Sequence, residues 1–404
     1  MISPQDSTAT SAKPLQGIKV IEFTHMVMGP TVGLILADLG AEVIKVEPIQ
    51  GDNTRRLKGS GAGYFPMYNR NKRSISLNLK SDSGLELAKK LVASADVLVE
   101  NFRPGTMAHL GLGYEELSAL HPKLIYCSLK GFLSGPYENR VALDEVTQMM
   151  GGLAYMTGLP DRPLRAGSSV IDITGGMFGV IGVLAALQER HLTGRGKYVT
   201  SALFETTAFL VGQHMAQECV SGEAPPPMSV RRSAWAIYDI FDLSGGSRLF
   251  VGIVSDTLWQ RFCKEFDRSD WATDETLSTN QGRVNAREWL LPAVSKMFSC
   301  FDIDTLSQRL ERAGLPFAPI NSPSDLFDDD HLNASNGLLE VTLTDGDNAG
   351  AKAKLPGLPL EFDHQRSGLY RDLPTSGQDA ESILCELGVD AKEYAELRAA
   401  KIVG

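Results

Sequence analysis

The sequence lacks the motifs by which proteins commonly hold metals, dinucleotides or nucleoside triphosphates. Its five cysteines are scattered along the chain and form no CxxC pair, so we expect free thiols in a reducing cytoplasm and no metal site. Neither GxGxxG nor GxxxxGKS/T occurs, which removes the main support for a nicotinamide cofactor or a nucleoside triphosphate.

Signals for a nucleic-acid or membrane partner are also missing. The net charge is −10 over 404 residues, which argues against nucleic acid or an anionic membrane as a partner. Residues 1–14 contain no apolar core of a secretory signal, and the most apolar stretch, residues 177–187, is shorter than the ~20 residues that span a bilayer. We therefore expect a cytoplasmic protein with a loose tail at residues 1–13.

Strand-like and helix-like segments alternate over residues 16–130. Short apolar runs predict strands, and longer segments between them carry helical periodicity. This order predicts an α/β fold with a doubly wound, mostly parallel sheet, and ligands at the carboxyl ends of its strands. The expected strands are 17–23, 41–47, 73–79, 95–102 and 123–132, with helices at 29–40 and 82–94.

Three consecutive prolines mark a break in the second half of the chain. They favour an extended segment that cannot continue a helix, so residues 220–235 are expected to form a linker. Two strand patterns around a Ser-Gly-Gly turn, followed by three helical patterns, predict a smaller α+β domain at 226–330. Beyond residue 355 the chain becomes loop-rich and ends in two predicted helices, near 378–388 and 391–400.

One carboxylate, Asp172, stands alone at the head of a long apolar segment. No other charge occurs between Arg165 and Glu189, and the segment is rich in glycine and alanine. Interior glycines let another backbone approach closely, but each lowers helix stability by roughly 0.8–1 kcal/mol relative to alanine. Because a helix N-terminus favours any carboxylate, local sequence leaves two interpretations open: a plain N-cap or a catalytic group.

Two positively charged stretches border predicted strands. The first contains Arg70, Lys72, Arg73 and Lys80, and the second is the turn within residues 100–111. A solvated surface is one interpretation, and an anion-binding site at the sheet edge is the other.

Two further polar positions carry less information. Lys130 follows another predicted strand, where a single lysine indicates little. Asp144 and Glu145 precede a double glycine, and acids at a helix start are their default interpretation.

Eight segments occur along the chain in a distinctive order: GIKVIEFTHMVMGP, LADLGAEVIKVE, NRNKRSISLNLK, ADVLVENFRPGTMAHLGLGYEEL, LIYCSLKGF, QMMGGLAYMTG, DITGG and ERHLTGRGKYVTSALFE, with a weaker match in GQDAESILCELG near the C-terminus. In these segments and their order the sequence resembles the class III CoA-transferase family, which contains formyl-CoA transferase, carnitine CoA-transferase and α-methylacyl-CoA racemase. The resemblance covers nearly the whole chain and is densest over residues 16–206.

The resemblance implies a fold, an assembly and an activity. Residues 14–219 and the return segment 331–404 would form one large α/β domain, and two chains would interlock like rings in a homodimer. Asp172, in the motif IDITGG, would be the nucleophile that carries CoA as an aspartyl thioester between an acyl-CoA and a small carboxylic acid. Coenzyme A would then be a substrate, with no prosthetic group. Backbone N–H groups near Gly175 and Gly176 are expected to hold a developing oxyanion.

Positions that contact CoA in the family carry over residue by residue. Two departures weaken this mapping, because His109 and Pro48 replace arginines of formyl-CoA transferase. The implied CoA-binding residues are His25, Val27 and Met28 after the first strand, Leu77 and Lys80 near the adenine and 3′-phosphate, Asn101, Phe102 and Arg103, His109, and Lys130.

Two other functions remain as alternatives. A racemase of this family needs a histidine directly before the aspartate that matches Asp144, but this position is Leu143, which cannot accept a proton. The other alternative is a catalytically silent CoA-binding homologue, and the presence of Asp172 argues against it.

For the carboxylic acids that donate and accept CoA, the sequence predicts only the chemical class. The long glycine-rich loop of formyl-CoA transferase has no counterpart, which argues against formate and oxalate as the dedicated pair. Arg231 and Arg232 either pair with a distal carboxylate or belong to a solvated linker. The apolar loop HMVMGP offers a wall for a carbon chain. We therefore expect small dicarboxylates, with succinyl-CoA as the donor.

Overall fold

The computed structural model describes residues 13–230 and 233–404, and the chain divides into two units. Unit 1 contains the described residues up to Ser229 together with Asp330–Gly404, and unit 2 is Val230–Asp329. Arg231 and Arg232 lie outside the described residues.

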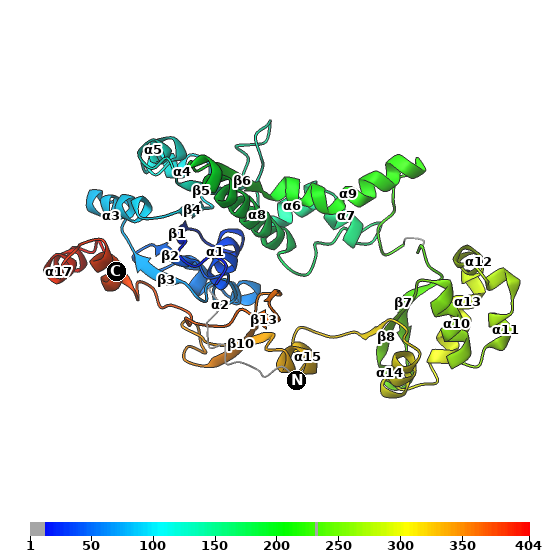
Figure 1. The fold of residues 1–404 in the computed structure, drawn as a ribbon. Coiled ribbons are helices and arrows are strands. Elements are labelled where there is room, and N and C mark those ends of the chain that lie inside the picture. Colours follow the sequence, from blue (N-terminus) through cyan, green and yellow to red (C-terminus); the bar gives the residue numbers. More distant parts are fainter. Residues whose placement is uncertain (1–12, 231–232) are drawn as a thin grey trace, which may run out of the picture. The chain divides into compact units, whose positions relative to one another are not determined.

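A six-stranded parallel sheet in the order β3-β2-β1-β4-β5-β6 organises unit 1 (Figure 1). The chain winds outward from β1 to β3 and then from β4 to β6, so β1 and β4 are neighbours at the point where the order reverses. This arrangement confirms the predicted doubly wound sheet. The strands are β1 (Lys19–Phe23), β2 (Glu42–Glu47), β3 (Arg73–Ser76), β4 (Val97–Glu100), β5 (Ile125–Lys130) and β6 (Tyr198–Ala202).

Each face of this sheet carries its own hydrophobic core, because successive side chains of a strand point to opposite faces. Val20 and Val97 belong to the core that includes residues of α1 and α8, whereas Ile21 and Leu98 belong to the core that includes α3 and α16. The helices of the first part of unit 1 are α1 (Met28–Asp38), α2 (Tyr64–Tyr68), α3 (Asp82–Ala93), α4 (Thr106–His109), α5 (Tyr114–Leu120), α6 (Asp144–Met150), α7 (Leu153–Thr157), α8 (Val170–Thr193) and α9 (Leu203–Ser221), with short 3-10 turns η1 (Asn53–Arg56) and η2 (Gly59–Gly61).

The long helix α8 packs closely against α1. A side chain at Gly176 would meet the Met28 carbonyl oxygen at 2.8 Å, and one at Gly179 would meet Val32 at 3.1 Å. The glycines predicted to allow close approach therefore do so. By length and composition alone α8 could cross a membrane, but its glycines Gly175, Gly176 and Gly179 are buried in unit 1.

The last part of the chain returns to the edge strand β3. The Ser76 carbonyl accepts a hydrogen bond from the Gly404 N–H at 3.0 Å, and the Asn78 N–H donates to the Ile402 carbonyl at 2.9 Å. Unit 1 is therefore built from both ends of the chain (Figure 1). The return segment also forms two small antiparallel sheets that the sequence did not predict. Its elements are α15 (Asp330–Ala334), β10 (Leu338–Thr342), β11 (Lys352–Pro356), β12 (Glu361–Phe362), β13 (Gln365–Arg366), α16 (Ala380–Glu386) and α17 (Ala391–Ala399), and the short turn η5 (Asp325–Phe327) precedes them at the end of unit 2.

Unit 2 is an α+β unit in which a three-stranded antiparallel sheet, β7-β8-β9, shares an aromatic core with its helices. Trp259, Phe262 and Trp271 stack with ring centroids 5.5 to 6.3 Å apart. The elements are β7 (Ile237–Asp242), η3 (Ser244–Gly246), β8 (Arg248–Ile253), α10 (Asp256–Glu265), α11 (Ser269–Ala272), η4 (Glu275–Leu277), α12 (Asn280–Asn285), α13 (Arg287–Phe298), α14 (Ile303–Arg312) and β9 (Phe317–Pro319).

Candidate active site

Asp172 lies in the first turn of α8, as its third residue, and its side chain is half-buried. The N-cap residue of this helix is Ser169, so Asp172 is not the N-cap that local sequence left open. Within the described part of the chain, no residue forms a hydrogen bond with the Asp172 carboxylate. The carboxylate is thus held at a fixed place in the helix but remains available to a ligand.

Asp144, rather than Asp172, accepts hydrogen bonds from the backbone N–H groups at the N-terminus of α8. One Asp144 oxygen accepts hydrogen bonds from the N–H groups of Ile171 at 2.9 Å and Asp172 at 3.1 Å. Its other oxygen accepts from Gln148 Nε2 at 2.6 Å. The Arg165 guanidinium lies 3.9 Å from Asp144 and 3.6 Å from Glu145. Asp144 is therefore a buried capping group from α6, which gives it a structural role.

The surroundings of Asp172 favour its neutral form. Burial, followed by repulsion from the Asp144 carboxylate, raises the pKa of Asp172 to about 7, although Arg165 acts in the opposite direction. Burial, followed by the negative charge of Asp172, raises the pKa of Tyr68 in α2 to about 12. A carboxyl group with a pKa near neutrality is typical of a group that exchanges protons or attacks a substrate.

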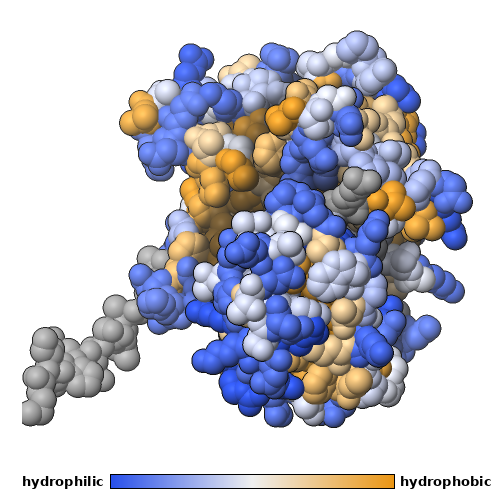
Figure 2. All heavy atoms as spheres, turned by 90° about the vertical axis from the view of Figure 1, so that its right-hand side faces the viewer, coloured by the Kyte–Doolittle hydropathy of each residue, from blue (hydrophilic) through white to orange (hydrophobic). Residues whose placement is uncertain are grey.

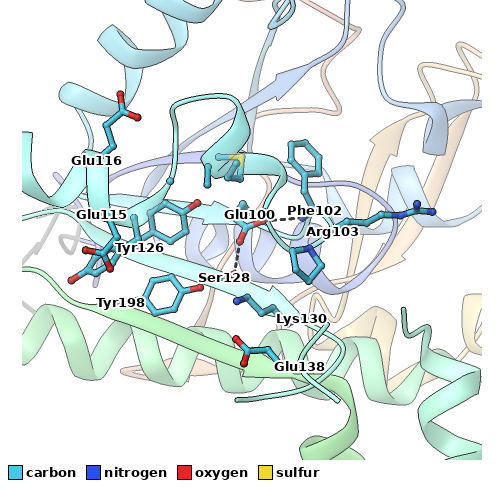
Figure 3. A pocket seen from close by; sticks show the side chains of 16 residues that line it. Glu100, Phe102, Arg103, Glu115, Glu116, Tyr126, Ser128, Lys130, Glu138 and Tyr198 are labelled. Carbon is cyan, nitrogen blue, oxygen red and sulfur yellow. Dashed lines mark hydrogen bonds between the residues drawn. The ribbon is translucent and has the colours of Figure 1, made fainter. Parts of the chain in front are cut away.

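A cavity of about 490 Å³ opens where β4 and β5 end. Figure 3 shows Glu100 and Ser128 in its centre, Lys130 and Glu138 together on one side, and the rings of Tyr126 and Tyr198 on the other. Glu100 accepts hydrogen bonds from the Ser128 hydroxyl and, at 2.9 Å, from the Phe102 N–H, and burial raises its pKa. Phe102, Arg103 and Lys130 are the predicted CoA-binding residues that line this cavity.

His25 joins the same region from the neighbouring strand. The Asn101 side chain accepts from the His25 N–H at 3.0 Å and donates to the His25 carbonyl at 2.9 Å. The rings of His25 and Phe102 pack in a T-shaped arrangement with centroids 5.9 Å apart. The loops after β1 and β4 thus touch at the point where the strand order reverses, where sheets of this kind bind their ligands.

The remaining predicted CoA-binding residues are not brought into this group. Val27, Met28 and Leu77 have buried side chains, and Leu77 belongs to the core and pairs with Val403. Lys80 and His109 are exposed. Of the described residues that line the cavity, none is Leu77, Lys80 or His109, and Asp172 is not among them either.

The basic run 70–73 does not form an anion site. Arg70 is buried and pairs with Asp38 at 2.7 Å, while Lys72 is buried and lies 2.9 Å from Glu22. Arg73 pairs with Glu42 and with Glu386. Arg70, Lys72 and Arg73 are therefore already neutralised inside unit 1, so these three residues of the first stretch do not supply an anion site.

The oxyanion prediction at Gly175 and Gly176 also needs correction. Both residues lie inside α8, where N–H groups are used by the helix itself. Their lack of a side chain is needed for packing instead: a Cβ at Gly175 would lie 2.6 Å from the Met28 methyl carbon.

Sequence reasoning missed Tyr68 and the pair formed by Glu100 and Ser128. Tyr68 is separated from Asp172 by about a hundred positions, and no local pattern links them. Glu100 and Ser128 stand opposite each other on neighbouring strands, so only the register of β4 and β5 brings them together. Throughout residues 13–230 and 233–404, no cluster of three or more His, Cys, Asp or Glu side chains could hold a metal, and the five cysteines are free.

Comparison with known proteins gives matches over almost the whole chain. The model of CoA-transferase family III matches residues 15–380. An acyl-CoA transferase from Fusarium pseudograminearum is 34% identical, with 90% of it and 98% of this chain aligned. A succinate–glutarate CoA-transferase from Agrobacterium fabrum is 32% identical, with 96% of it and 93% of this chain aligned. The crystal structure of a CAIB/BAIF family protein from Brucella suis is 33% identical and superposes with a TM-score of 0.81 over 93% of this chain and 100% of that one.

Proposed function

Because the chain belongs to CoA-transferase family III and is therefore a CoA-transferase, we propose that it moves CoA from a small dicarboxylic acyl-CoA, such as succinyl-CoA, to a second carboxylic acid, with Asp172 as the nucleophile. The observation that carries this proposal is the Asp172 carboxylate itself. It is half-buried and forms no hydrogen bond with the described residues. It does not need to cap α8, because Asp144 accepts the hydrogen bond from the Ile171 N–H at the start of that helix.

The proposed chemistry conserves the thioester through four exchanges. The Asp172 carboxylate attacks the donor carbonyl, the C–S bond breaks, and a mixed anhydride and a CoA thiolate result. The thiolate then attacks the aspartyl carbonyl, so that the donor acid leaves and an aspartyl–CoA thioester remains. The acceptor carboxylate attacks this thioester and releases the thiolate again. Attack of the thiolate on the acceptor acyl group gives the new acyl-CoA and restores Asp172.

Dicarboxylates are favoured by both sequence and similarity. The Agrobacterium fabrum relative is named for succinate and glutarate, which are both dicarboxylates. Within the loop predicted to face the carbon chain, Met26 is 39% exposed, whereas Val27 and Met28 are buried, so Met26 alone of these three offers an apolar wall. A contact of Arg231 or Arg232 with the distal carboxylate stays a prediction.

Borohydride trapping tests the covalent route. We expect incubation with succinyl-CoA and borohydride to lower the mass of the peptide that contains Asp172, because reduction of the thioester converts its carboxyl group to an alcohol. The same treatment with CoA alone is the control. If no peptide changes mass while deuterium from solvent enters the α-position of the acyl-CoA, the chain has the chemistry of a racemase instead.

The pH dependence of the first half-reaction reports on Asp172. Its carboxylate is the reactive form, so kcat/KM for the acyl-CoA should fall about tenfold per pH unit below pH 7 and level off above it. Replacing Asp144 with Asn removes the neighbouring charge that raises the pKa of Asp172, and the midpoint should move down by about one pH unit.

Asp390→Asn is the matched control for this shift. Asp390 caps α17 through the N–H groups of Lys392 and Glu393, so the substitution removes another capping carboxylate from unit 1. Its pH profile should equal that of the unaltered protein. A midpoint that stays at pH 7 in Asp144→Asn would contradict the assignment of the titrating group.

The assembly and the cellular context are further parts of the proposal. Apolar side chains on α8 and α9 are exposed, including Ile181 at 58% and Phe209 at 71%, which supports a homodimer with these helices at the interface. Figure 2 shows hydrophobic residues gathered beside hydrophilic ones on the face that it draws. We propose an interlocked homodimer that acts in the cytoplasm without a prosthetic group, a nucleic acid or a membrane. A light-scattering mass equal to one 43.8 kDa chain would contradict the dimer.

A further inference from the structure

Six charged side chains lie buried beneath the loop that follows β1. Three cations and three carboxylates balance in charge, so the group as a whole is neutral. Burying ion pairs removes them from water, and such pairs often add little net stability to a fold. The group therefore calls for a role other than stabilisation. Its members are Glu22, Lys45, Glu47, Asp52, Arg55 and Lys72.

Two of these cations are held in place by a shared carboxylate. The Lys72 ammonium lies 2.9 Å from one Glu22 oxygen and 3.1 Å from the other. The Lys45 ammonium lies 3.7 Å from Glu22 and 3.1 Å from Asp52. Because both side chains are fully buried, neither ammonium has water as an alternative partner.

The same two ammonium groups hold the two ends of the loop 24–30, which comprises the turn after β1 together with Met28, Gly29 and Pro30 of the first turn of α1. Lys45 donates to the Thr24 carbonyl at 2.7 Å, and Lys72 donates to the Pro30 carbonyl at 3.0 Å. Between these ends, the Met26 N–H donates to the Thr54 hydroxyl at 3.0 Å, and Met26 has a φ of 64°, an unfavourable value for a side chain other than glycine. The loop 24–30 is thus fixed at both ends and in its middle.

This loop lies between the cavity at the ends of β4 and β5 and the helix α8, which carries Asp172. On one side, His25 contacts Asn101 and Phe102, and Phe102 lines the cavity at the ends of β4 and β5. On the other side, Met28 packs against Gly175, three residues beyond Asp172. A shift of the loop would therefore alter the cavity mouth and the helix of Asp172 together.

We propose that Lys72 and Lys45 are positioning residues that hold the loop 24–30 in the place required to bind the CoA portion of the substrate. This inference rests on the proposed function, since it assigns CoA to the region of His25 and Phe102. The two lysines do not touch the substrate. They act through the Thr24 and Pro30 carbonyl groups, and the Glu22 carboxylate keeps both ammonium groups directed there.

Lys72→Met removes one of these donors and tests the proposal. We expect the dissociation constant of CoA, measured by calorimetry, to rise about tenfold, while the KM for the acceptor acid stays within about twofold. Amide hydrogen exchange over residues 24–31 should become faster, and exchange in β4 should not change. Calorimetry with CoA needs no turnover, so a wrong proposed function would show as absent transfer by the unaltered protein.

Arg70→Met is the matched control. Arg70 is also buried, stands two residues before Lys72 and pairs with Asp38, but it makes no hydrogen bond to the loop 24–30 in the described structure. Equal weakening of CoA binding by Arg70→Met and Lys72→Met would indicate a general structural effect and overturn the proposal.

Thr54→Val covers the case in which Lys72→Met does not fold. It removes the acceptor of the Met26 N–H without changing any charge. We expect CoA binding about threefold weaker and faster exchange of the Met26 amide. Unchanged CoA binding and unchanged exchange over 24–31 in Thr54→Val would also overturn the proposal.

Discussion

Asp172→Asn should lose CoA transfer, with kcat reduced by at least about 1000-fold, because the amide cannot form the mixed anhydride or the CoA thioester. The substitution keeps the size of the side chain and leaves the hydrogen bonds between Asp144 and the start of α8 in place. CoA should still bind, and borohydride should no longer change the mass of the peptide. Steady-state assays with succinyl-CoA and a dicarboxylate acceptor measure this loss. Transfer at more than a tenth of the original rate would exclude Asp172 as the nucleophile.

The same variant should be more stable than the original protein at pH 8. The pKa of Asp172 is about 7 in the folded state and about 3.8 when unfolded, so folding becomes less favourable as the pH rises from about 4 to about 7. Asn removes this penalty. We expect the free energy of unfolding to rise by about 2 kcal/mol at pH 8, allowing for partial exposure, and this gain to vanish toward pH 4. Urea titrations at several pH values measure it, and a gain independent of pH would contradict the assignment.

Gly33→Ala should destabilise unit 1 by more than about 3 kcal/mol, since it would force apart a buried ion pair. A Cβ at Gly33 would lie 1.7 Å from a Glu22 carboxylate oxygen and 2.9 Å from the Lys72 ammonium. Neither group can move aside without losing its partner. Urea denaturation followed by circular dichroism measures the effect, and we expect little soluble folded protein at 37 °C.

Gly212→Ala is the control and should change stability in the opposite direction. Gly212 lies inside α9, and a Cβ there would meet no atom within 4 Å. Alanine is favoured over glycine inside a helix, so this substitution should stabilise the protein by about 0.5–1 kcal/mol. If both substitutions have the same sign, the close approach of α1 to Glu22 is not what determines the cost at Gly33.

The sheet of unit 1 could be predicted because its strands and the helices between them can be recognised from residues that are neighbours in sequence. Each strand is a short apolar run, and the helices between consecutive strands force neighbouring strands to be parallel. The predicted strand at 41–47 became Glu42–Glu47, and the predicted helix at 82–94 became Asp82–Ala93. These elements needed no information from distant residues.

The site was predicted less well, because its chemistry depends on pairs that are far apart in sequence. In the sequence Lys72 resembles a surface cation, but in the structure it is buried and pairs with Glu22 of β1. Asp144 looks like an ordinary helix-start acid, but its carboxylate satisfies a different helix 27 residues away. For Asp172, local chemistry left the role open, and only the ordered family segments pointed to catalysis.

The return of residues 371–404 to β3 has a consequence for synthesis on the ribosome. Ser74 receives a hydrogen bond from the Gly377 N–H, some 303 positions later, and its own N–H donates to Asp379. One edge of the first sheet therefore stays incomplete while the whole of unit 2 is translated. During that interval β3, a buried strand in the finished fold, is open to other nascent chains. We infer that premature release before residue 371 yields an aggregating product rather than a smaller working enzyme.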